Sequence, residues 1–135
     1  MFEVLAAEPT SDGTLVVRLH GELDLQQEPL LWVALDGLPE HALLVLDLRR
    51  LEFIDSSGVR ALFLAQEQTT AAGRDYLVVT PRAGSARRVF EILDLDRVAW
   101  VVDTLPHAGP APARRRAAAP AADWSRSLQR EGHPG

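Results

Sequence analysis

The sequence predicts a small α/β domain built on a mostly parallel sheet of about five strands, with an N-terminal antiparallel hairpin and three or four helices. Short apolar runs alternate with segments of helical periodicity, which is the pattern of repeated strand–helix–strand units. Such units form parallel sheets with right-handed crossovers. The chain has 135 residues, of which 47% are hydrophobic and 24% charged. This size and composition indicate one soluble globular domain.

The N-terminal part of the chain contains two predicted strands and a helix. Residues 2–7 and 14–20 are strand-like, and the Pro, Asp and Gly residues between them suit a hairpin loop longer than two residues. A helical pattern follows, with Pro29 in its first turn and Pro39 after its end. Its apolar face is formed by leucines at helical spacing: Leu31, Leu35 and Leu38.

The remaining elements alternate buried strands with helices. In residues 43–48 and 76–80 apolar residues follow one another rather than alternating with polar ones, which is typical of strands covered on both faces. One helix is predicted to begin at residues 55–57, where Asp55, Ser56 and Ser57 are three possible N-terminal caps, and another to begin with Ser85 as its cap. Residues 98–102 are predicted to form the last strand.

The C-terminal residues differ from the rest in composition and charge. Residues 1–105 contain 17 acidic residues and 9 arginines, a net charge of −8, whereas residues 106–135 contain 2 acidic residues and 5 arginines, a net charge of +3. We therefore predict one domain over residues 1–105 and a flexible Pro/Ala/Arg-rich tail over 106–135. A short helix over 123–130 is one interpretation within that tail. The acidic domain argues against nucleic acid as a partner.

Absent residue types exclude several chemistries. All 14 basic residues are arginine and there is no cysteine, so phosphate-binding P-loops, Schiff-base catalysis, thiolate catalysis and disulfides are excluded. The four histidines show no metal-ligand spacing, and we expect neither a metal nor a cofactor. The chain begins without a basic leader and contains no apolar run approaching ~18 residues. A cytoplasmic location without membrane contact is expected.

A polar segment, Asp-Ser-Ser-Gly at residues 55–58, follows a buried strand and opens a helix. Functional groups gather at this end of parallel strands, although helix capping is the simpler interpretation. A cap needs only one of these side chains. Gly58 costs about 1 kcal/mol relative to alanine early in a helix, so it requires a reason. Close approach of another backbone, a protein partner or a phosphate would supply one.

Other polar groups do not form a recognisable active site. A hydrolase elbow needs glycine two residues before the serine, where this chain has Ile54 before Ser56, and we expect no enzyme activity. Three arginines near the third predicted helix could bind an anion, although a solvated helix face is the simpler interpretation: Arg82, Arg87 and Arg88.

Three segments of the sequence resemble the STAS domain family. Residues 21–24 (GELD) resemble the signature that follows the second strand, and residues 45–58 resemble the apolar strand and its DSSG loop. Residues 88–95 resemble the stretch before the last strand. The similarity covers residues 2–103, with the motifs in order, and implies a single STAS-like domain.

Stand-alone STAS domains with this loop look like bacterial anti-sigma factor antagonists. The resemblance implies binding to an anti-sigma factor, often a GHKL-type serine kinase, which releases a sigma factor. It also implies that phosphorylation of Ser56 by the kinase stops binding, and that a serine phosphatase restores it. The implied partner-binding residues are Asp24, Asp55, Ser56, Ser57, Gly58 and Arg60. We expect a monomer.

The sequence departs from the family pattern at several positions. Arg60 stands where a small residue is common, and Asp94 replaces the usual glycine before Leu95. The family's last helix is not evident, since Pro106 interrupts the pattern. Three alternatives remain: a STAS scaffold or accessory interaction module independent of phosphorylation, a small enzyme, for which the sequence offers no assembled nucleophile and base, and a DSSG segment that is merely a helix cap.

Overall fold

The computed structural model describes residues 2–106. The predicted tail from residue 107 onward, including the short helix at 123–130, lies outside the described residues. The elements, in chain order, are β1 (Phe2–Pro9), β2 (Thr14–Leu23), α1 (Glu28–Asp36), β3 (Leu43–Ile54), α2 (Ser56–Ala71), β4 (Asp75–Val79), α3 (Gly84–Ile92), a 3-10 helix (Leu95–Arg97) and β5 (Val101–Val102).

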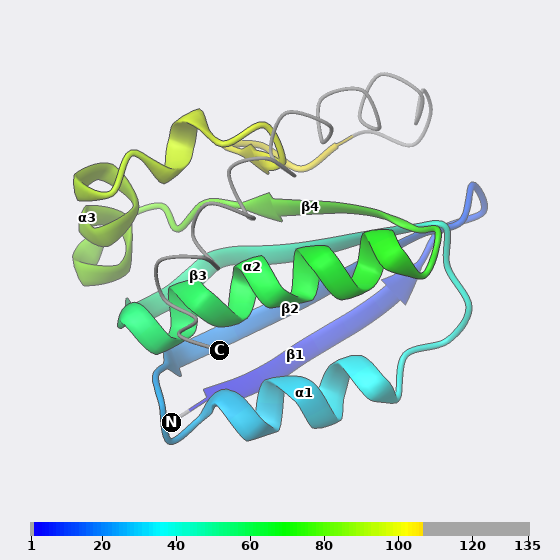
Figure 1. Cartoon of the computed structure of the whole chain (residues 1–135), viewed down its shortest axis with the longest axis horizontal. Coiled ribbons are helices and arrows are strands. Elements are labelled where there is room, and N and C mark those ends of the chain that lie inside the picture. Colours follow the sequence, from blue (N-terminus) through cyan, green and yellow to red (C-terminus); the bar gives the residue numbers. More distant parts are fainter. Residues whose placement is uncertain (1, 107–135) are drawn as a thin grey trace.

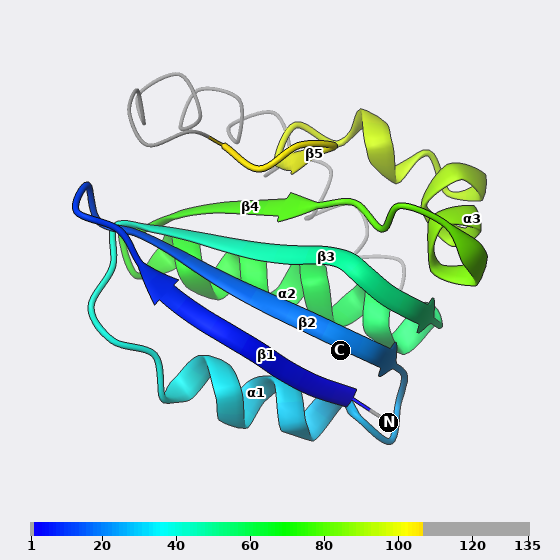
Figure 2. The ribbon, with the colours of Figure 1, turned by 180° about the vertical axis from the view of Figure 1, so that it is seen from behind.

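The strands form one five-stranded sheet in the order β1-β2-β3-β4-β5. β1 and β2 are antiparallel, and every other neighbouring pair is parallel. Successive crossovers advance in the same direction across the sheet, so right-handed connections place their helices on the same face. Figure 1 shows α1 and α2 on that face and α3 near the carboxyl ends of the strands. Figure 2 shows the opposite face, where no described helix covers the sheet. These observations confirm the predicted fold class.

The core is centred on β3. All six residues from 43 to 48 are buried, as the continuous apolar run predicts. Between β4 and α2, the Tyr76 hydroxyl donates a 2.9 Å hydrogen bond to the Leu62 carbonyl oxygen. The Trp100 ring packs edge-on against Phe63 and Tyr76, with ring centroids 4.7 and 5.2 Å apart. These contacts join α2 to β4 and to the segment before β5.

Several predicted boundaries were wrong. β2 continues through residues 21–23 and β3 continues to Ile54, because the two strands remain paired to their ends. The last strand is only two residues long, because the Val101 amide closes a turn on the Val98 carbonyl at 2.9 Å. Ser85 is not the cap of α3. The chain turns into that helix at Gly84, whose φ is +80°, so Ser85 lies within the first turn.

Asp94 occupies a backbone conformation that suits glycine. Its φ of 54° and ψ of 34° lie in the left-handed region, and among the described residues it is the only non-glycine with positive φ. The residue connects the end of α3 to the 3-10 helix. A side chain at such a position is strained, although aspartate tolerates it better than most residues do. The departure from the family's glycine therefore costs stability.

We expect Asp94→Gly to raise the free energy of unfolding by about 0.5–1 kcal/mol, since the relief of strain exceeds the added chain entropy. Urea denaturation measures the change. Asp96→Gly is the control, because Asp96 lies inside the 3-10 helix at negative φ and should lose stability. Equal destabilisation by both substitutions would contradict this reasoning.

A buried carboxylate interrupts the apolar run of β3. Asp47 is only 4% exposed, and its two oxygens accept hydrogen bonds of 2.9 and 2.8 Å from the Nε and Nη2 atoms of Arg49. Arg18 lies 3.7 Å from the same carboxylate. Burial opposes ionisation, but the hydrogen bonds and charges of the arginines outweigh it, so the pKa of Asp47 lies below its usual value.

We expect Asp47→Asn to lower the free energy of unfolding by about 1–2 kcal/mol near pH 7. Because the pKa is depressed in the folded state, this stabilisation is present above the ordinary aspartate pKa and disappears as pH falls through the folded-state value. Urea titrations at decreasing pH should show the two proteins converging. Asp103→Asn, at an exposed aspartate, is the control. Its free energy of unfolding should stay close to that of wild type at every pH.

Candidate functional site

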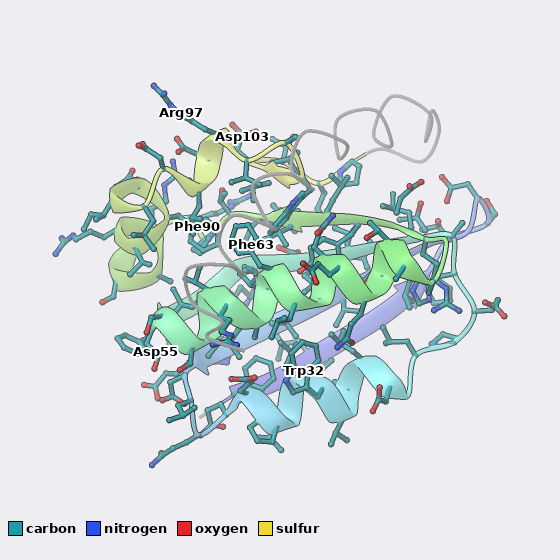
Figure 3. All side chains as sticks on the ribbon, in the orientation of Figure 1. Trp32, Asp55, Phe63, Phe90, Arg97 and Asp103 are labelled. Carbon is teal, nitrogen blue, oxygen red and sulfur yellow. The ribbon has the colours of Figure 1, made fainter. Side chains whose placement is uncertain are left out.

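The candidate site is centred on Asp55, at the junction of β3 and α2 (Figure 3). Asp55 is the N-terminal cap of α2, and its Oδ1 atom accepts a 2.9 Å hydrogen bond from the Gly58 amide. Its Oδ2 atom accepts a 3.4 Å bond from the Leu25 amide. Its own amide donates to the Leu23 carbonyl at 3.3 Å. A single residue therefore joins the start of α2 to the end of β2 and the loop that follows it.

Asp24 shapes that neighbouring loop. Its Oδ1 atom accepts a 3.0 Å hydrogen bond from the Gln27 amide, and its carbonyl accepts a 2.9 Å bond from the Glu28 amide. These bonds turn the chain from β2 into α1. Because Leu23 and Leu25 both contact Asp55, the structure brings the segment around Asp24 beside the start of α2. The two predicted acidic positions thus belong to one surface.

Gly58 is required by a close backbone contact. A Cβ atom at this position would lie 2.3 Å from the Leu23 carbonyl oxygen and 2.6 Å from Cγ1 of Ile54. Of the reasons considered for this glycine, the structure supports the approach of another backbone. The first turn of α2 therefore rests directly on the end of β2, and Gly58 is buried beneath the candidate surface.

Ser56 is exposed at the first position of α2. Asp55 supplies the cap, and within residues 2–106 the Ser56 hydroxyl forms no hydrogen bond. Ser57 is half-buried. Arg60 is exposed one turn later, at the i+4 position that shares a helix face with Ser56. The site therefore presents an unengaged hydroxyl at the positively polarised end of a sixteen-residue helix.

Two exposed apolar residues beside these positions were not predicted. Leu25 is 67% exposed, and its amide is bonded to Asp55; Phe53, two residues before Asp55, is 39% exposed. Both residues are apolar but fall outside the periodic patterns that identify core residues. An apolar residue at such a position is the sequence signal that could have predicted an exposed contact residue. An exposed apolar side chain next to polar groups is typical of a protein-binding surface.

The described residues reveal neither a metal site nor a membrane-spanning helix. No group of three His, Cys, Asp or Glu side chains within residues 2–106 is placed to hold a metal ion. None of the helices in that range has both the length and the apolar character needed to cross a membrane. The residues at this end of β2 and α2 carry a hydroxyl, carboxylates, a guanidinium and exposed apolar side chains.

Comparison with known proteins identifies related sequences and folds. The sequence model of the family described as "Mlab, STAS domain" matches residues 6–103. None of the curated proteins matches the sequence. An anti-sigma factor antagonist from Mycobacterium paratuberculosis is 28% identical, with a TM-score of 0.59, and the match covers 78% of this chain and 88% of that one.

Two further solved structures show likeness of fold. The anti-sigma factor antagonist SpoIIAA in its unphosphorylated form is 23% identical, with a TM-score of 0.60, over 85% of this chain and 97% of that one. A sulfate transporter family protein from Wolinella succinogenes is 16% identical, with a TM-score of 0.56, over 89% of this chain and 92% of that one. The same fold therefore occurs in an anti-sigma factor antagonist and in a sulfate transporter family protein, so the fold alone does not establish function.

We expect Gly58→Ala to lower the free energy of unfolding by about 1–3 kcal/mol, because the added methyl group would overlap a backbone oxygen. This direction opposes helix propensity, which favours alanine by about 1 kcal/mol. Gly37→Ala is the matched control: its Cβ would have no contact closer than 3.8 Å, and it should change stability by no more than about 0.5 kcal/mol. Thermal and urea denaturation of both variants measure the difference.

Proposed function

The chain belongs to the STAS domain family, and we propose that it acts as an anti-sigma factor antagonist. In this proposal it binds an anti-sigma factor that is also a GHKL-type serine kinase, and thereby releases a sigma factor. Phosphorylation of Ser56 ends the binding, and a serine phosphatase restores it. The observation that carries the proposal is the exposed hydroxyl of Ser56, which is left unengaged because Asp55 caps the helix.

The position of Ser56 favours a binding switch over an unfolding switch. A phosphoserine adds about −1.5 to −2 charges and three acceptor oxygens. An anion at a helix N-terminus is stabilised by about 0.3–1 kcal/mol. The neighbouring carboxylate of Asp55 opposes this gain through repulsion of similar size. The net effect of phosphorylation on folding should therefore be small.

The same charge would have a large effect at an interface. A hundredfold loss of affinity requires only about 2.8 kcal/mol. Burying an unmatched charge against a partner costs several kcal/mol. The partner surface proposed here combines the exposed Leu25 with the polar residues around Ser56. Because a partner that covers Leu25 would exclude water from the contact, a phosphate on Ser56 would be placed in a desolvated interface.

The alternative is an accessory STAS module whose binding does not depend on phosphorylation. The capping role of Asp55 supports this reading, because it accounts for part of the DSSG segment without any switch. The two functions predict different behaviour of Ser56. An accessory module would keep its partner when a negative charge is placed there, whereas the antagonist would lose it.

We expect Ser56→Asp to retain the fold and lose the partner, with an affinity at least about a hundredfold lower, while Ser56→Ala binds constitutively. Wild type and both variants would serve as baits in a bacterial lysate, with bound proteins identified by mass spectrometry. The supporting result is a GHKL-type ATPase retained by wild type and Ser56→Ala but lost with Ser56→Asp. Ser85→Asp adds the same charge at an exposed position in α3 and should bind normally.

The captured kinase then allows a direct test of the modification. Incubation with the kinase and ATP should add one phosphate to the wild-type protein, located at Ser56 by peptide mass spectrometry, and none to Ser56→Ala. Capture of the same partners by wild type and Ser56→Asp would instead establish the accessory module. A melting temperature lowered by tens of degrees in Ser56→Asp would refute the argument that the switch leaves folding intact.

A further inference from the structure

A basic cavity lies on the sheet face opposite the helices. Its volume is about 710 Å³, and its lining includes four arginines, one acid and one exposed leucine: Arg18, Arg49, Arg50, Arg82, Asp47 and Leu5. Tyr76 contacts α2 and pairs with Leu44, so the side chains of β3 at even positions up to 48 face the helices. Asp47 is at an odd position and faces the other way. The cavity is therefore separate from the surface around Ser56.

Irregularities in two strands bring these residues together. From Arg18 to His20, β2 advances two residues while β3 advances three, from Asp47 to Arg50. β1 likewise carries one extra residue, Leu5, opposite the step from Arg18 to Leu19. Bulges of this kind redirect side chains and are frequent beside binding sites. Here both occur on the two sides of the same stretch of β2, and Leu5 and Arg49, which lie within the two irregular stretches, line the cavity.

Among the described residues that line the cavity, arginines outnumber carboxylates. The single carboxylate, Asp47, is bonded to Arg49 through both oxygens and lies 3.7 Å from Arg18. Arg50 and Arg82 are exposed, and neither forms a hydrogen bond or ion pair with any residue in the range 2–106. The described lining thus contains four guanidinium groups and one carboxylate, in a domain whose residues 1–105 carry a net charge of −8. Such a concentration of positive charge in an acidic domain favours an anionic ligand.

We propose that this cavity binds a small molecule carrying a phosphate group, with Arg50 and Arg82 contacting the phosphate. Guanidinium groups match the geometry of phosphate oxygens and bind them through paired hydrogen bonds. The volume lies within the range of about 300–1,000 Å³ that is usual for small-molecule sites. Leu5, 46% exposed, offers an apolar contact for the organic part of the ligand. Asp47 is a positioning residue, because it fixes the guanidinium of Arg49 at the cavity wall.

Calorimetric titration of the full chain tests the proposal with glucose 6-phosphate, inorganic phosphate and glucose, at constant ionic strength. We expect the two phosphate probes to bind and glucose alone not to bind. Tighter binding of glucose 6-phosphate would identify an organic phosphate as the ligand, and equal binding would identify free phosphate. Either result supports a phosphate site.

Matched variants locate the site. Arg50→Gln and Arg82→Gln should each weaken phosphate binding by at least about tenfold, since each loses a hydrogen bond to a charged group. Arg97→Gln is the control: Arg97 extends from the 3-10 helix away from the sheet, and its loss changes the net charge equally (Figure 3). Circular dichroism verifies that the variants are folded.

Three results would overturn the proposal. They are the absence of phosphate binding at about millimolar concentration, equal weakening by Arg97→Gln and the two cavity variants, and binding of a hexaglutamate peptide without binding of either phosphate probe. The last result would assign the cavity to an acidic protein segment. None of these readouts depends on Ser56, so failure of this proposal leaves the proposed antagonist function untouched.

Discussion

The pairing of β3 with a parallel strand on each side is the constraint on which most of the structure depends. Its apolar first half is buried and forms the centre of the core. Because β2 runs alongside it in parallel to the end, Leu23 and Ile54 finish as neighbours, and the next residues of each strand meet. That meeting creates the junction around Asp55. Earlier along β3, an extra residue opposite β2 brings Arg50 to the cavity on the other face.

The order and type of the elements could be predicted because buried strands and amphipathic helices leave different periodicities in the sequence. Their boundaries depended on tertiary pairing. Residues 21–23 contain a glycine and a glutamate, which are poor strand formers, yet pairing with β3 keeps them in β2. The prediction that Ser85 caps α3 was wrong because the start of the helix is set by the backbone rather than by a capping side chain. Gly84 turns the chain by adopting positive φ, and a serine one residue later gave a misleading capping signal.

The sequence singled out the residues of the candidate site but could not give the contact that each of them makes. The sequence offered three possible capping side chains and could not choose among them, and the structure assigns the cap to Asp55. It also could not decide why residue 58 is glycine, since the answer is the Leu23 carbonyl, far away along the chain. Of the cavity residues, the sequence singled out only Arg82, as one of three arginines that could bind an anion. The arginines of the cavity come from three separate segments, and strand bulges have no local sequence signature that would bring them together.

The direct contact between Gly58 and the end of β2 holds the first turn of α2 in a fixed position. With no side chain between the helix and the strand, the first turn of α2 cannot move closer to β2, and Asp55 ties the same turn to the loop beyond it. A partner that recognises this surface therefore meets groups already in their final positions. On the proposed function, a chemical change at Ser56 would act on a surface whose backbone is already held by these contacts. The delay between such a change and the partner's response would be set by diffusion and by partner dissociation, rather than by slow motions within this domain.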